Sequence, residues 1–100
     1  MPKPIRLRPE AVAEATEARK WYEERSEAAA IGFLESLKDA FSQIEQRSGS
    51  HPVYDDPLRV VVLKKYPYIV LYRELADETE IVAIAHGRRK PGYWSDRLNQ

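Results

Sequence analysis

The sequence has no cysteine among its 100 residues, and it has only four glycines and two histidines. Without cysteine there is no disulfide framework and no thiolate metal site, and a reducing compartment fits the composition without being required by it. None of the glycines belongs to a Gly-rich loop of the kind that cradles phosphates. Because His51 and His86 are far apart in the chain, we expect neither a metal site nor any other cofactor.

Long apolar runs are also missing. The N-terminal sequence MPKPIRLRPE lacks the apolar core of a signal peptide, and no run approaches the ~18 residues of a membrane span. We therefore expect a cytoplasmic protein that has no membrane partner. The length predicts a single domain, residues 1–100, with one hydrophobic core. The apolar pattern leaves the oligomeric state open.

The formal net charge is zero, but the charges are unevenly distributed. Residues 1–58 carry 8 basic and 11 acidic side chains, whereas residues 59–100 carry 8 basic and 5 acidic ones. The second half therefore offers a basic surface that could meet a polyanion or an acidic protein segment. The chain as a whole is not of the strongly basic type expected of a dedicated nucleic-acid binder.

Two helices are predicted after a short strand at residues 5–8. The first begins at Pro9 or Glu10, because proline suits a first helical turn, and it ends near Arg25. The second has Ser26 as its N-cap and Gly49 as the residue that follows its last turn. The first carries a narrow stripe of Ala11, Ala15, Ala18 and Tyr22. The second carries a broad face of Ile31, Leu34, Leu37, Phe41 and Ile44, widened by Ala30, Phe33 and Ala40.

The remainder of the chain is predicted to be β structure. Residues 50–57, SHPVYDDP, indicate a loop because of their two prolines and Asp pair. Strands follow at residues 58–65, 68–75 and 80–86, joined by short turns into an antiparallel meander. We therefore predict an α+β fold in the order β-α-α-β-β-β. Its two antiparallel helices pack on a mainly antiparallel four-stranded sheet that the N-terminal strand completes.

Candidate functional residues gather where the last strand ends. Residues 81–85 form a continuous apolar run, and the next twelve residues contain an imidazole, four cations, a phenol and an indole. Arginine, tyrosine and tryptophan are the residues enriched in binding hot spots. The candidate binding surface, for a target or an inhibitor, consists of Arg59, Arg73, His86, Arg88, Arg89, Tyr93, Trp94 and Arg97, with Lys90 beside them.

Several of these side chains have two possible roles. His86 is either a general base or a hydrogen-bonded structural residue at a strand end. Trp94 either contacts a partner directly or folds back as a lid over the sheet face that the helices leave free. Arg59 and Arg73 extend the cationic surface only if both point to that same face.

Fragments of the sequence resemble the RelE/ParE superfamily of bacterial toxins. The resembling residues are Ala18–Tyr22, Ala30 with Phe33 and Leu37, Arg59, Pro67–Arg73 and Ile84–Arg89. The ending, His86-x-Arg88-Arg89 followed by Tyr93-Trp94, resembles the ParE-like branch. The resemblance implies a RelE/ParE-like fold and the toxin of a type II toxin–antitoxin system. It also implies a cognate antitoxin as partner, with DNA gyrase or the ribosome and its mRNA as target.

The two known outcomes of that superfamily differ in the cations they require. RelE-like members cut mRNA on the ribosome and carry lysines and an arginine at places where this sequence has Val60, Val62 and Ile69. This departure favours ParE-like inhibition of DNA gyrase by binding. One alternative is a ribosome-dependent endoribonuclease that uses His86, Arg88 and Tyr93. The other is an inactive relative that only binds its antitoxin.

Overall fold

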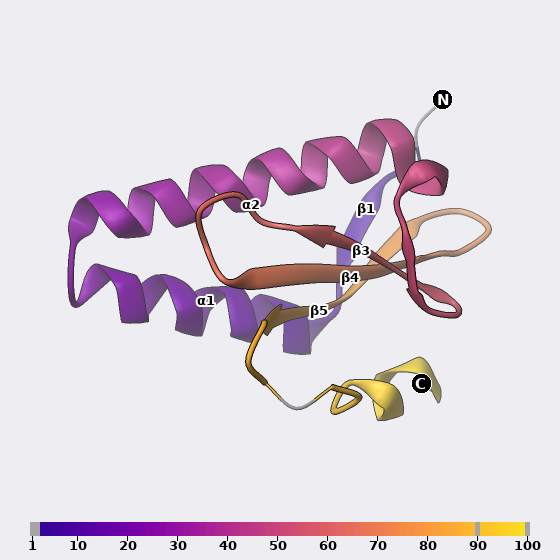
Figure 1. Cartoon of the computed structure of the whole chain (residues 1–100). Helices are drawn as coiled ribbons and strands as arrows, with labels where there is room; N and C mark the ends of the chain where they lie inside the picture. The colour runs from indigo at the N-terminus through magenta and orange to yellow at the C-terminus, as the bar shows by residue number, and fades with distance from the viewer. Residues whose placement is uncertain (1–2, 90, 100) are drawn as a thin grey trace.

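The computed structural model describes residues 3–89 and 91–99 (Figure 1). Its elements are β1 (Ile5–Leu7), α1 (Pro9–Glu23), α2 (Glu27–Arg47), β2 (Val53–Asp55), β3 (Leu58–Val62), β4 (Tyr68–Glu74) and β5 (Thr79–His86). Short 3-10 helices follow α2 at Ser48–Ser50 and close the chain at Ser95–Asn99. Two helices and a mostly antiparallel sheet confirm the predicted α+β class. In the part of the chain that the structure describes, neither helix is long and apolar enough to cross a membrane.

The sheet has five strands in the order β1-β5-β4-β3-β2, so the predicted count of four is wrong. β1 joins β5 in parallel, as the N-terminal strand was expected to join the meander, and the other neighbours are antiparallel. The extra strand β2 lies inside residues 50–57, which were predicted to be a loop. All three residues of β2 are exposed, and for this reason no alternation of apolar and polar residues marked it as a strand.

Both helices cover one face of the sheet (Figure 1). Ser26 caps α2 as predicted, its hydroxyl accepting from the backbone N–H of Ala29 at 3.2 Å. Gly49 directly follows the C-cap Ser48, as predicted, but it lacks the positive φ of a typical C′ glycine because the chain continues through it into a 3-10 helix. The predicted apolar face of α2 is rotated, since Ile31 and Leu34 are exposed. The buried face consists of Ala30, Phe33, Leu37, Ala40 and Ile44.

This rotation follows from a group of aromatic rings between the helices and the sheet. Phe33 packs against Tyr22 of α1, against Tyr66 of the β3–β4 loop and against Tyr68 of β4, with ring centroids 5.3–5.6 Å apart. Aromatic pairs at such separations stabilise beyond the area they bury. They therefore direct Phe33, rather than Ile31 or Leu34, toward the core.

The C-terminal segment, residues 91–99, covers the opposite face of the sheet. Trp94 is only 3% exposed there, which is the lid position among its two expected roles. The second core that it completes contains Leu58, Leu71, Val82, Ala83 and Ala85. The apolar character of both sheet faces, visible in the sequence, therefore reflects two covers, the helices on one side and the chain's own end on the other.

Candidate functional site

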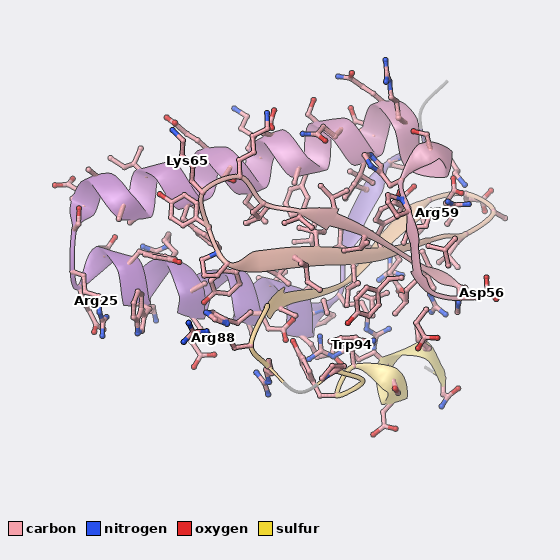
Figure 2. All side chains as sticks on the ribbon, viewed as in Figure 1. Arg25, Asp56, Arg59, Lys65, Arg88 and Trp94 are labelled. Carbon is pink, nitrogen blue, oxygen red and sulfur yellow. The ribbon has the colours of Figure 1, made fainter. Side chains whose placement is uncertain are left out.

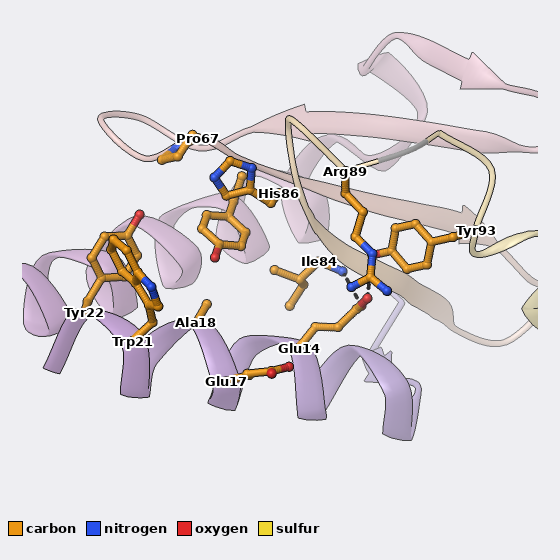
Figure 3. Close-up of a pocket in the computed structure, with 11 residues that line it drawn as sticks. Glu14, Glu17, Ala18, Trp21, Tyr22, Pro67, Ile84, His86, Arg89 and Tyr93 are labelled. Carbon is orange, nitrogen blue, oxygen red and sulfur yellow. Dashed lines mark hydrogen bonds between the residues drawn. The ribbon is translucent and has the colours of Figure 1, made fainter. Parts of the chain in front are cut away.

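A pocket of about 430 Å³ opens between α1 and the end of β5 (Figure 3). Helix α1 contributes one wall and β5 the opposite one, and the segment after β5 closes one end. The lining residues are Glu14, Glu17, Ala18, Trp21, Tyr22, Pro67, Tyr68, Ile84, His86, Arg89 and Tyr93. The pocket therefore combines aromatic walls with both signs of charge.

The pocket exists because β5 loses its neighbour halfway along. β1 pairs only with Thr79–Ile81, so the rest of β5 has no strand on that side. The register of β5 on β4 passes from Ile81 directly to Ala83 and leaves Val82 as a bulge. Bulges change which residues face a strand's edge, and Val82 and Ile84 thereby direct backbone groups toward α1.

Side chains take the place of the missing strand. The carboxylate of Glu14 on α1 accepts the Ile84 N–H at 3.0 Å, and the guanidinium of Arg97 donates to the Val82 carbonyl at 3.0 Å. Arg97 also binds both carboxylate oxygens of Glu14, at 3.0 and 3.2 Å. Because Glu14 and Arg97 are only 13% and 14% exposed, this ion pair belongs to the interior and fastens the C-terminal segment to α1.

Tyr93 belongs to the same arrangement. Its hydroxyl donates to Glu14, and its ring lies 4.1 Å from the guanidinium carbon of Arg89 and 5.2 Å from that of Arg97. Burial, followed by the hydrogen bond to Glu14, raises the pKa of the Tyr93 hydroxyl. At neutral pH this hydroxyl is therefore a weak acid whose proton is already engaged.

His86 lies on the helix side of the sheet, at the other end of the pocket from Tyr93 (Figure 3). Its ring meets Tyr68 edge-on with centroids 5.1 Å apart. Its Nδ1 accepts the backbone N–H of Arg88 at 3.0 Å. An accepting Nδ1 leaves the proton of the neutral ring on Nε2, so His86 is prepared to donate a hydrogen bond.

The remaining predicted residues are not in the pocket. Arg73 binds the buried Glu80 at 2.8 Å and the Leu98 carbonyl at 3.2 Å, and it lies on the sheet face under the C-terminal segment. Arg59 lies far from Arg88 (Figure 2) and donates to the His51 carbonyl at 2.6 Å. Arg59 shares its face with the helices, so the two sheet arginines do not form one cationic surface.

The eight predicted residues thus divide into groups. The structure brings together His86, Arg89, Tyr93 and, through Glu14, Arg97. Arg88 is exposed beside them, Trp94 is in the second core, and Arg59 and Arg73 are engaged elsewhere. Lys90 lies outside the described residues. No group of three or more histidine, aspartate or glutamate side chains in the described ranges is arranged to hold a metal.

Sequence reasoning missed the α1 wall of this pocket. Glu14, Ala18 and Trp21 follow one another at spacings of four and three, which places them on one side of a helix. Trp21 is 50% exposed, unusual for so large an apolar residue on a helix that packs on a sheet. The helical spacing of these three residues was the signal that could have revealed the wall.

A second surface lies on the other face of the sheet. Val62 on β3 pairs with Ile69 on β4, and both share their face with Val60 and the second core. Val62 is 67% exposed. Val60, Val62 and Ile69 therefore form an apolar surface on this face.

Comparison with known proteins agrees with this architecture. The sequence profile described as ParE toxin of the type II toxin–antitoxin system parDE matches residues 5–91. A solved structure described as the chromosomal ParDE toxin–antitoxin system from P. aeruginosa is similar in fold, with a TM-score of 0.62 at 16% sequence identity. The similarity covers 84% of this chain and 95% of that chain. No curated protein sequence gives a significant match.

The family match covers residues 5–91 and therefore includes β1, α1, the open edge of β5, Arg88 and Arg89, whereas Tyr93 lies beyond it. The chain belongs to the ParE toxin family of type II toxin–antitoxin systems.

Proposed function

We propose that this ParE-family toxin arrests growth in the cytoplasm by binding DNA gyrase, and that a ParD-type antitoxin neutralises it. Family membership supports the antitoxin, because the family is defined by the parDE pair. The choice of gyrase over the ribosome rests on the chemistry of the candidate residues.

The observation that carries this choice is the absence of cations on the sheet surface made by Val60, Val62 and Ile69. Cleavage of RNA requires positive charges that hold the scissile phosphate and offset the charge that develops on it. The side chains at these three places are aliphatic, and the nearby Arg73 is held by Glu80. An apolar surface of this kind suits contact with a protein better than contact with a phosphate backbone.

The two acid–base candidates, His86 and Tyr93, are also poorly placed for cleavage of RNA on this surface. His86 lies on the helix side of the sheet, whereas Val62 and Ile69 lie on the opposite side. The Tyr93 hydroxyl donates to Glu14 and has a raised pKa. His86 and Tyr93 line opposite ends of one pocket. A general acid and a general base must exchange protons with the substrate, and the Tyr93 hydroxyl and the His86 Nδ1 are already engaged by Glu14 and by the Arg88 N–H. This geometry favours a toxin that acts by binding.

The exposed residues near the pocket are the kind that bind proteins. Arg88 and Arg89 are exposed after β5, and Trp21 is half exposed on α1 with the Arg25 guanidinium 3.6 Å from its ring. Arginine and tryptophan dominate the energetics of protein interfaces. We assign Arg88 and Arg89 to the contact with the target.

Induction of this chain alone in bacteria tests the proposal, with growth, mRNA integrity and plasmid supercoiling read from the same culture. We expect growth arrest, altered supercoiling and intact mRNA, and inhibition of purified gyrase by the purified chain. Arg88→Glu should reduce this inhibition, whereas the matched Lys38→Glu on α2 should not. If the wild-type chain cleaved mRNA and His86→Ala did not, the protein would instead be the endoribonuclease. Normal growth with folded protein would establish an inactive relative.

A further inference from the structure

The end of β5 carries a backbone acceptor and a backbone donor that face the pocket. The Ile84 N–H points away from β4, since it donates to Glu14 on α1. The Gly87 N–H points to the opposite edge of the strand, where it donates to the Pro67 carbonyl beside β4. The Ile84 C=O and the His86 N–H therefore point to the same open edge as the Ile84 N–H. Within residues 3–89 and 91–99 neither group has a hydrogen-bond partner. Such a pair is a template for one residue of an added strand.

Beside this backbone pair the pocket provides room for a side chain. Ala18, Trp21 and Tyr22 of α1 face Tyr68 of β4 across a space of about 430 Å³. This volume lies in the range of sites that bind ligands through mainly apolar walls and a few polar groups. The site therefore combines the two elements of strand addition, in which main-chain bonds supply affinity and a neighbouring pocket selects the side chain.

The charged residues around the opening of the pocket indicate which charge the bound segment should carry. Arg88 and Arg89 are exposed at the β5 end, and neither forms an ion pair within the described residues. The His86 ring offers an Nε2–H donor beside them. Glu14 and Glu17 are the acidic groups on the opposite wall, and the charge of Glu14 is already paired with Arg97. A carboxylate next to the inserted side chain would pair with the arginines.

We propose that this pocket receives an extended segment of the antitoxin, which adds one residue as a strand to Ile84 and His86. Its apolar side chain lies between α1 and Tyr68, and a neighbouring carboxylate meets Arg88 and Arg89. The proposal rests on the antitoxin of the proposed function. A flexible segment fits better than the folded surface of gyrase, because α1 and the C-terminal segment flank the edge and only a thin chain can enter between them.

A pair of variants isolates the backbone contact. His86→Pro removes the N–H that faces the pocket and leaves the hydrogen bonds between β5 and β4 in place. His86→Ala keeps this N–H and removes only the imidazole. We expect the antitoxin encoded beside this chain to bind His86→Pro at least tenfold more weakly than His86→Ala in calorimetric titration. Trp21→Ala should weaken binding as well, whereas Val62→Ala, on the opposite face of the sheet, should not.

Hydrogen exchange of the wild-type complex provides a measurement that does not depend on whether the proline variant folds. The His86 amide should exchange rapidly in the free toxin and become protected when the antitoxin binds. Binding without this protection, or equal affinities of the two His86 variants, would overturn the proposed strand addition and leave the proposed function standing. If the wild-type chain binds no antitoxin, the proposed function loses its partner and the inference fails with it. Protection by gyrase instead of the antitoxin would assign the pocket to the target and overturn the inference.

Discussion

Replacing Glu14 with glutamine should destabilise this protein far more than a typical surface change. The glutamine keeps the shape and can still accept the Ile84 N–H, but it leaves the guanidinium of Arg97 in the interior without a counter-charge. Removing one partner of a fully buried ion pair costs about 3–5 kcal/mol. Because Glu14 and Arg97 keep 13% and 14% exposure, we expect a loss of about 2–3 kcal/mol in the free energy of unfolding.

The converse change should cost less. In Arg97→Gln the carboxylate of Glu14 keeps the Ile84 N–H and the Tyr93 hydroxyl as donors, so we expect a loss of about 1–2 kcal/mol. The double variant should lose less than the sum, with a coupling energy of about 1–2 kcal/mol. Urea unfolding monitored by circular dichroism measures all three free energies.

A second ion pair on α1 serves as the control. Arg19 and Glu23 are 2.8 Å apart, but their side chains are 31% and 57% exposed. Glu23→Gln should therefore cost no more than about 0.5 kcal/mol. If Glu14→Gln cost no more than Glu23→Gln, or if the double variant were additive, Glu14 and Arg97 would not replace a strand at the edge of β5.

Two further predictions concern the cores. Trp94→Ala should lower the free energy of unfolding by about 3–5 kcal/mol in urea, because a buried indole is lost from the second core; a loss no larger than that of the half-exposed Trp21→Ala would contradict the lid. Burial raises the pKa of Tyr72 to about 12, above its value near 10 in an unfolded chain, so stability should be unaffected below pH 10 and fall between pH 10 and 12. Urea midpoints between pH 10 and 12 should fall less steeply with pH in Tyr72→Phe than in the wild type. An equal slope in the two proteins would contradict the raised pKa of Tyr72.

The helices and the meander could be predicted because their signals are local. Ser26 at the start of α2 and the apolar run at residues 81–85 need no knowledge of the remaining chain. β2 could not be predicted, since its three exposed residues are a strand only because β3 lies beside them. The rotation of α2 also depends on distant residues, namely the rings that surround Phe33.

The candidate site shows the same division. The basic and aromatic residues after β5 were visible in the sequence as a cluster. Their partners were not, because Glu14 meets Arg97 across 83 residues and Arg73 meets the Leu98 carbonyl across 25. Whether an arginine is available to a target or bound within the fold depends on such contacts, and a single sequence does not contain them.

Strand β5 links the stability of this toxin to its proposed interactions. Along one edge it pairs first with β1 and then with the side chains of Glu14 and Arg97, and at the pocket it has no partner among the residues that the structure describes. The same ion pair that replaces a strand at Val82 and Ile84 also holds the C-terminal segment, and this segment positions Tyr93 under Arg89. Glu14→Gln should therefore weaken antitoxin binding even where the protein remains folded, because the end wall of the pocket would no longer be fixed. A folded Glu14→Gln variant with unchanged affinity would show that the open edge of β5 alone suffices.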